Sequence, residues 1–140
     1  MAGKAYEADT RKVLRKLPAT VLFIDGNHEN FADLNSYAVE QWHGGKVHII
    51  EDDIIHLMRG QVFDIKGKLF FTFGGAYSIE KMNRSEGIDW FPEEMPSREE
   101  YQEGMGNLYK YSKVLCALRC KNAISYTNTD RKKKWEKGTN

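Results

Sequence analysis

The chain has 140 residues, 41% hydrophobic and 29% charged, which is the profile of one globular domain rather than a disordered chain. Its formal net charge of +1 argues against a general nucleic-acid-binding surface. No apolar run reaches the roughly 20 residues of a membrane-spanning helix, and no signal-peptide apolar region is present, so we expect a cytoplasmic protein without a membrane partner.

Residues 5–17 have the spacing of an amphipathic helix, which Pro18 would end. We expect Tyr6, Val13, Leu14 and Leu17 to face inward and Arg11, Lys12, Arg15 and Lys16 to face outward. A run of basic residues can bind nucleic acid, but a solvated helix face is the expected role here.

Residues 21–30 place polar side chains at the end of a short apolar segment. Residues 21–24 predict a buried strand, and an Asp-Gly pair ends it in a turn. Asn27 and His28 follow at the strand's C-terminal end, where ligand-binding groups gather in open α/β sheets. Asn offers a carbonyl oxygen to a cation, and His can ligate a metal or transfer a proton near neutral pH. The alternative is an ordinary turn leading into a helix at residue 29 or 30.

A short helix and a strand are expected between residues 29 and 50. Apolar side chains recur at helical spacing in residues 29–41, namely Phe31, Leu34, Tyr37 and Ala38. A His-Gly-Gly break at 43–45 precedes a strand at 46–50, in which apolar residues alternate with Lys46 and His48. We interpret His48, and His56 further along, as surface or half-buried strand residues, and residues 51–53 as a turn.

Three further strands are predicted, with turn residues between them. They cover residues 54–58, 61–65 and 69–73, and the last two form a strong hairpin signal around Lys66-Gly67. Consecutive hairpins indicate antiparallel pairing, which fits a sandwich with parallel and antiparallel parts. Gly74 and Gly75 follow the last strand and allow a close approach by a ligand or by a neighbouring strand.

The C-terminal third contains a helix start and both cysteines of the chain. Ser97 and Glu100 form a capping-box pattern, which predicts a helix from about Arg98, weakened in its middle by two glycines. Cys116 and Cys120 would share one face of a helix. Two reduced thiols are the expected interpretation, and a redox or metal-binding pair is the alternative.

Several segments together resemble the calcineurin-like metallophosphoesterases, in particular a bacterial and phage-type subgroup. The first is Gly26-Asn27-His28-Glu29 behind its strand, and the others span residues 57–60, 73–78 and 90–97. The resemblance implies an α/β fold, with a β-sandwich of mixed parallel and antiparallel strands flanked by helices. It also implies Asn27 as a metal ligand and His28 as the catalytic histidine. Two divalent metal ions (Mn, Fe or Zn) would serve a phosphomonoester or phosphodiester substrate.

The resemblance also suggests residues around the reacting phosphate. Arg59, Gly74 and Gly75 are candidate active-site neighbours. Arg59, Lys81 and Arg84 are candidate phosphate-facing cations. For each of these cations taken singly, a surface or ion-pairing role is the expected one.

The sequence departs from the family pattern in its metal-binding blocks. It has no Asp-x-His, no Gly-Asp and no Gly-His-x-His, and no histidine follows His56. The resemblance ends near Tyr111. We therefore expect a partial phosphoesterase domain at residues 1–112, with terminal parts of the fold missing, and a divergent, largely disordered basic tail at residues 113–140.

Two functional hypotheses follow. The first is a metal-dependent phosphoester hydrolase. The second is a catalytically inactive remnant or interaction module of the same fold, which would oligomerise through an exposed sheet edge. Nucleic-acid binding through the basic tail is a weaker third hypothesis.

Overall fold

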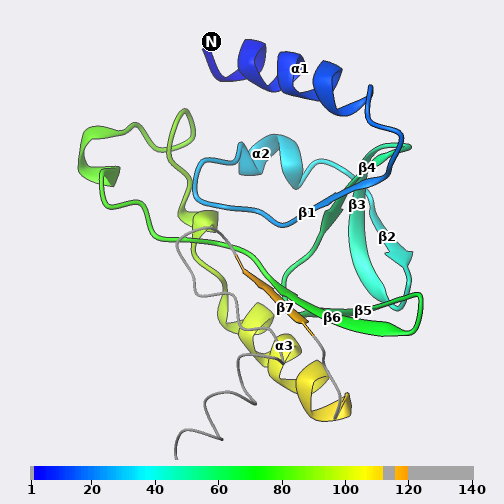
Figure 1. Cartoon of the computed structure of the whole chain (residues 1–140). Helices are drawn as coiled ribbons and strands as arrows, with labels where there is room; N and C mark the ends of the chain where they lie inside the picture. The colour runs from blue at the N-terminus through cyan, green and yellow to red at the C-terminus, as the bar shows by residue number, and fades with distance from the viewer. Residues whose placement is uncertain (1, 112–115, 120–140) are drawn as a thin grey trace, which may run out of the picture.

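The computed structural model describes residues 2–111 and 116–119 of the chain (Figure 1). These residues form a mixed α/β structure with two small β-sheets. The predicted α/β class and the mixture of parallel and antiparallel strands are therefore confirmed. The finer assignment to a metallophosphoesterase-type fold stays a prediction.

The first sheet has the strand order β1-β4-β3-β2. Strand β1 runs parallel to β4, while the β4–β3 and β3–β2 pairs are antiparallel. The strands are β1 (Val21–Phe23), β2 (Val39–Trp42), β3 (Gly45–Glu51) and β4 (Ile54–Leu57). Strand β2 was not predicted, because residues 39–41 are exposed and show no apolar alternation.

The second sheet has the order β5-β6-β7, and its first pair is the predicted hairpin. The strands are β5 (Gln61–Ile65), β6 (Lys68–Phe73) and β7 (Cys116–Arg119), with β7 parallel to β6. Lys66 and Gly67 have φ of 53° and 77°, as a two-residue type I′ turn requires. The chain changes sheet between β4 and β5, so these two strands do not pair as a hairpin.

Side chains from both sheets meet in one apolar core. Val47, Ile55 and Leu57 of the first sheet and Phe63 of the second form a fully buried cluster. Burial of each such side chain contributes about 2 kcal/mol. A Cβ atom at Gly45 would stand 2.6 Å from Cε1 of Phe63, so this glycine makes room for the ring. The core holds the two sheets against each other as a small sandwich.

The N-terminal helix α1 (Ala2–Leu14) lies outside the first sheet, at the top of Figure 1. The predicted inward face is wrong for Val13 and Leu17, which are 62% and 48% exposed. The helix ends at Leu14, earlier than predicted, and Leu17 follows it in a turn. Arg15 faces outward, as predicted, and its exposed side chain makes two hydrogen bonds to Glu51 at the end of β3.

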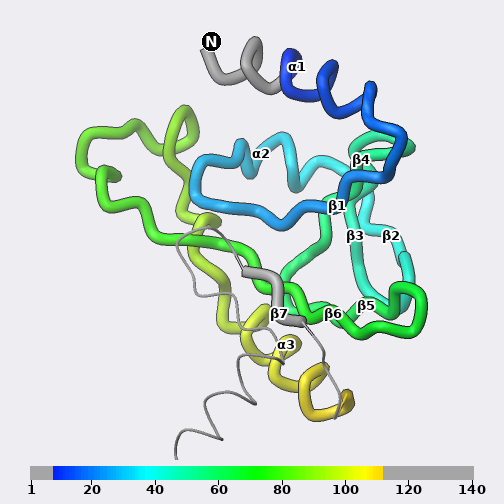
Figure 2. Tube along the Cα trace, in the orientation of Figure 1, coloured from blue at the N-terminus to red at the C-terminus, as the bar shows by residue number. Residues whose placement is uncertain are grey.

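Two further helices flank the sheets. The short α2 (Phe31–Leu34) buries Phe31 and Leu34, and Asn30 caps its N-terminus. The helix or helical loop predicted over residues 29–41 is a helix only at 31–34, and residues 39–41 belong to β2 instead. Helix α3 (Arg98–Lys110) begins with the predicted capping box of Ser97 and Glu100. The remaining long segment, residues 74–97, swings out to one side of the sheets (Figure 2) and contains the 3₁₀ turns η1 (Lys81–Asn83) and η2 (Pro92–Glu94).

Helix α3 approaches the second sheet closely because of a glycine. A Cβ atom at Gly104 would lie 3.2 Å from the Cα of Gly60 and 3.1 Å from the ring of Phe73. Gly104 was predicted only to weaken the helix. The structure shows that it is the contact point between α3 and the loop before β5.

The expected tail and the cysteine pair fall partly within the described residues. Cys116 begins β7, so this part of residues 113–140 is a strand, and helical spacing does not apply to Cys116. Cys120 and the rest of the expected tail lie outside the described residues. In the part of the chain that the structure describes, no helix has the length and apolarity needed to cross a membrane.

Candidate functional site

Asn27 lies just after β1 and is held by two residues of the 74–97 loop. Its Nδ2 donates to Ser78 Oγ at 3.1 Å, and Ser78 Oγ donates in turn to Glu94 Oε2 at 2.5 Å. A carboxylate can only accept, so the Ser78 hydroxyl proton is committed to Glu94 and its oxygen can only accept from Asn27. This fixes the orientation of the amide. Asn27 Oδ1 therefore points away from Ser78 and has no partner among the described residues.

Glu94 anchors this chain of hydrogen bonds from a buried position. Its side chain is 1% exposed and also accepts from Ser78 N at 2.8 Å. Burial disfavours the charged form, but the hydrogen bonds from Ser78, together with other groups that include the positive charge of Lys81, lower the pKa of Glu94 below its ordinary value. The carboxylate is thus ionised near neutral pH and keeps Ser78 as an acceptor toward Asn27.

His28 is exposed beside this chain and contacts a cation. Arg84 Nη1 lies 2.9 Å from His28 Nδ1, and it also donates to the backbone oxygen of Asp89 at 3.2 Å. A guanidinium is always a donor, so Nδ1 of His28 must be the acceptor. The proton of the neutral imidazole is therefore on Nε2.

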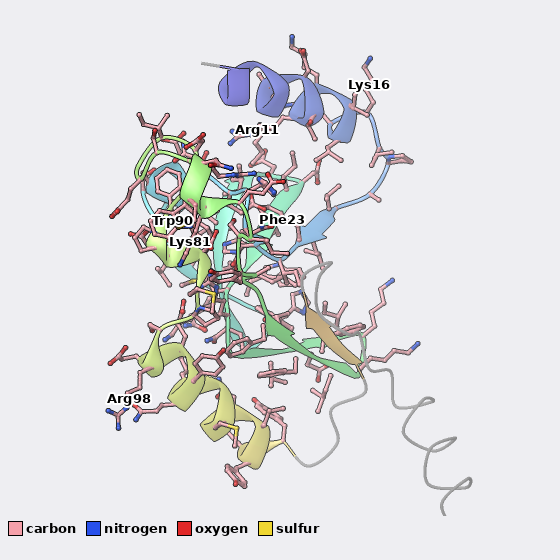
Figure 3. The ribbon with its side chains drawn as sticks, turned by 90° about the vertical axis from the view of Figure 1, so that its left-hand side faces the viewer. Arg11, Lys16, Phe23, Lys81, Trp90 and Arg98 are labelled. Carbon is pink, nitrogen blue, oxygen red and sulfur yellow. The ribbon has the colours of Figure 1, made fainter. Side chains whose placement is uncertain are left out.

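A second predicted cation lies in the same loop. Lys81 Nζ is 4.8 Å from the centre of the Tyr77 ring and 5.7 Å from that of Trp90. Figure 3 shows Lys81 and Trp90 next to each other in the 74–97 segment. The structure therefore brings Arg84 into contact with His28 and places Lys81 against aromatic faces.

Asp25 is the centre of a separate, buried polar cluster that the sequence did not indicate. The residue is 1% exposed. Its Oδ2 accepts from Arg59 Nε at 2.8 Å and Nη2 at 2.7 Å, and its Oδ1 lies 3.1 Å from His56 Nε2. Burial disfavours ionisation, but the hydrogen bond from His56 and the charge of Arg59 outweigh it and lower the pKa of Asp25. Asp25 was predicted only as a turn residue.

Two buried histidines extend the cluster across the first sheet. His48 on β3 is paired with His56 on β4, and their Nδ1 atoms are 3.2 Å apart. They are 3% and 4% exposed, so the prediction of surface or half-buried positions is wrong. The reason is that β3 and β4 are covered on both faces, by the core on one side and by Asp25 and Arg59 on the other. Burial, and then the neighbouring His56, lower the pKa of His48.

Arg59 is surrounded by acceptors. Besides Asp25, it donates to Glu100 Oε2 at 3.1 Å and to the backbone oxygen of Glu93 at 2.7 Å. Burial lowers its pKa, but Asp25 and Glu100 outweigh burial and raise it above the ordinary value. No contact joins Arg59 to Asn27 or His28 in the described residues. Its role as a phosphate neighbour stays a prediction.

Gly74 and Gly75, the two glycines predicted as active-site neighbours, make close contacts with other residues of the chain. The backbone of Gly74 lies against the Asp25 carboxylate, and Gly75 N donates to Asp25 O at 3.0 Å. Gly75 has φ of 85°, and a Cβ atom there would stand 2.6 Å from the backbone oxygen of Glu94. Both glycines thus connect the Asp25 cluster to the loop that holds Asn27.

A cleft of about 160 Å³ opens beside the buried cluster. Asp25, His48, His56 and Arg59 form its polar floor. Its other lining residues come from α2 and the residue after it, from the turn after β4, from η2 and the segment leading into α3, and from the first turn of α3. These are Phe31, Leu34, Asn35, Met58, Glu93, Met95, Ser97 and Glu100.

The described donors do not fit a dinuclear metal centre by themselves. Among residues 2–111 and 116–119, no three His, Cys, Asp or Glu side chains are grouped so that they could hold a metal ion. One amide oxygen, that of Asn27, is too few ligands for a divalent cation. No protein-family model, curated protein or solved structure matches the chain. Its function must therefore be inferred from its own residues.

Proposed function

We propose that the chain is a phosphoester hydrolase of the metal-dependent type that its sequence resembles, with Asn27 and His28 facing the substrate. The proposal combines that resemblance with the geometry at the end of β1. Metal ligands beyond Asn27 would come from polypeptide outside the described residues or from another chain. The described residues are one wall of such a site.

The observation that carries the proposal is the contact between Arg84 Nη1 and His28 Nδ1 at 2.9 Å. It places a fixed positive charge beside an exposed imidazole whose Nε2 bears the proton. A guanidinium next to an N–H donor is a good binding surface for phosphate oxygens. The neighbouring Asn27 adds a carbonyl oxygen that has no partner in the described part of the chain, and such an oxygen is the kind of ligand that hard divalent cations prefer.

His28 and Arg84 can assist the hydrolysis of a phosphoester through their own hydrogen bonds and charge. When a water molecule attacks the phosphorus atom, the bond between phosphorus and the leaving oxygen breaks. His28 Nε2–H can hydrogen-bond to that oxygen and stabilise the negative charge that develops on it. The attacking water loses a proton to solvent and the leaving oxygen takes one from solvent, so the leaving group departs as an alcohol or phenol. The guanidinium of Arg84 can stabilise the charge on the phosphoryl oxygens.

The test is hydrolysis of bis(p-nitrophenyl) phosphate and p-nitrophenyl phosphate by the full chain with added Mn²⁺, Fe²⁺ or Zn²⁺. We expect His28→Asn to lower kcat by about 10²- to 10³-fold, the usual contribution of one hydrogen-bond donor to a developing oxyanion. His43→Asn is the matched control, because His43 is an exposed histidine on the β2–β3 turn.

The two outcomes that contradict the proposal differ in meaning. Hydrolysis that is unchanged in His28→Asn would remove His28 from the mechanism. A folded chain without hydrolysis with any of the three metals would favour the inactive remnant or interaction module instead. Strands β1 and β2 are the edges of the first sheet within the described residues, and they are where a partner strand would then pair.

A further inference from the structure

We propose that the cleft over Asp25, His56 and His48 is a second binding site, specific for a small aromatic ring that carries cationic N–H donors. This site is independent of the Asn27–His28 end proposed above. His48 Nε2 would accept one hydrogen bond from the ligand. Glu100 at the cleft wall would attract its charge.

The direction of the hydrogen bonds defines His48 as an acceptor. The ionised carboxylate of Asp25 can only accept, so His56 Nε2 carries a proton and donates it over 3.1 Å. With one proton on each ring, His56 Nδ1 is then a lone pair. His48 Nδ1 must donate to it across the 3.2 Å contact. His48 Nε2 is thereby left with a lone pair and no partner among the described residues.

The His48 side chain belongs to the cleft lining, and its Nε2 is not one of the fully buried, unpaired atoms of the described residues. His48 is 3% exposed and is held on both sides, by its strand pairing and by its contact with His56. An acceptor that lines a cleft is satisfied by water or by a ligand that brings a donor. A fixed lone pair without a partner among the described residues therefore gives the cleft an acceptor for an N–H donor of a ligand.

The size and walls of the cleft favour one ring. Its volume of about 160 Å³ is close to the roughly 150 Å³ of an engineered protein cavity that binds benzene. Apolar side chains contribute to its wall from α2, from the turn after β4 and from the residue after η2, namely Phe31, Leu34, Met58 and Met95. An aromatic ring with a polar end matches this combination of apolar walls and polar floor.

The charge of the cleft selects a cation. Among the described lining residues Arg59 is the one with a lysine or arginine charge, and its guanidinium is already paired with Asp25 and Glu100. Two carboxylates thus face one guanidinium. Glu100 uses Oε2 for its bonds to Arg59 and Ser97, so Oε1 has no partner among the described residues. A ligand with N–H donors can satisfy both this oxygen and His48 Nε2.

The test is a titration of the full chain with benzamidinium, followed by isothermal calorimetry and by the side-chain ¹⁵N resonances of the histidines. We expect binding of benzamidinium at least tenfold tighter than that of benzyl alcohol, and none of benzoate. All three probes carry the same ring, so they differ mainly in charge and donors. The His48 Nε2 resonance should be that of an unprotonated nitrogen and should shift on binding.

Two variants separate the roles of the acceptor and the charge. His48→Asn keeps an amide donor near the position of Nδ1 but removes Nε2, and should weaken benzamidinium binding at least tenfold. Glu100→Gln keeps the capping box, since Gln also serves there, and should reduce the preference for benzamidinium over benzyl alcohol. Urea unfolding of each variant shows that it is folded.

Three results would overturn the proposal. One is a proton on His48 Nε2 in the free chain, which needs no variant to observe. Another is benzoate binding as tightly as benzamidinium. The third is binding that is the same in the wild-type chain and in folded His48→Asn, since the ligand would then occupy another place.

Discussion

The backbone of Gly74 lies so close to Asp25 that a Cβ atom on residue 74 would stand 2.5 Å from Cγ of the Asp25 carboxyl group. This contact joins the end of β6 to the buried polar cluster. It leaves no room for a side chain unless Asp25 moves, and Asp25 is held by Arg59 and His56. The glycine is therefore required by packing.

Gly74→Ala should destabilise the chain by about 3 kcal/mol, the upper part of the usual range for overpacking. Gly106→Ala is the matched control, because no atom outside α3 lies within 4 Å of a Cβ built at Gly106. It should stabilise the chain by about 0.5 to 1 kcal/mol through helix propensity. Urea unfolding of both variants measures the difference. Equal stability of the two would show that Asp25 can leave its position freely.

Asp25→Asn should destabilise the chain by about 3 to 5 kcal/mol, because it leaves the buried guanidinium of Arg59 without its closest counter-charge. The neutral amide also cannot accept from His56 and Arg59 together as the carboxylate does. Asp9→Asn makes the same chemical change at a side chain that is 75% exposed, and should change the free energy of unfolding by less than about 0.5 kcal/mol. A small effect of Asp25→Asn would mean that water reaches the cluster and solvates Arg59.

The free energy of unfolding should fall as the pH is lowered. The folded chain lowers the pKa of His48 from its ordinary 6.5, so below this pH the unfolded chain binds a proton that the folded chain does not. Asp25 changes the free energy of unfolding in the same direction. Its pKa is lowered in the folded chain, so its stabilising contribution is lost as the pH falls below its ordinary pKa of 3.8. Urea unfolding between pH 4.5 and 8 measures the fall in the free energy of unfolding that His48 causes. His48→Asn should remove most of this fall. A gain of stability on acidification would contradict a lowered pKa of His48 in the folded chain.

The elements that could be predicted are those whose signals are local in the chain. The capping box of Ser97 and Glu100 and the turn at Lys66-Gly67 specify a helix start and a hairpin within a few residues. Strand β2 and the exposed face of α1 depend on partners elsewhere. A local sequence pattern does not show such partners. For this reason β2 was not predicted, and the inward face of α1 was predicted wrongly.

Part of the buried cluster around Asp25 could nevertheless have been predicted from the sequence. His48 and His56 lie at equal distances along the chain from Asp52, at the centre of the predicted turn. Two strands joined at that turn place these residues opposite each other, as the structure shows. The approach of Gly74 to Asp25 and of Arg84 to His28 could not be predicted, because the path of the 74–97 loop depends on tertiary packing.

Ser78→Ala tests the hydrogen-bond chain that orients Asn27. The substitution removes the acceptor for Asn27 Nδ2 and one of the two donors to the buried Glu94, and it should destabilise the chain by about 1 to 3 kcal/mol. Without Ser78 Oγ, burial should raise the pKa of Glu94 toward its ordinary value, and the side-chain amide resonances of Asn27 should shift and broaden. Ser36→Ala is the control, since the Ser36 hydroxyl is exposed and donates only to a backbone oxygen. If the Asn27 amide resonances were the same in Ser78→Ala and in the wild-type chain, Ser78 would not orient the amide, and the carbonyl oxygen of Asn27 would not be held ready for a cation.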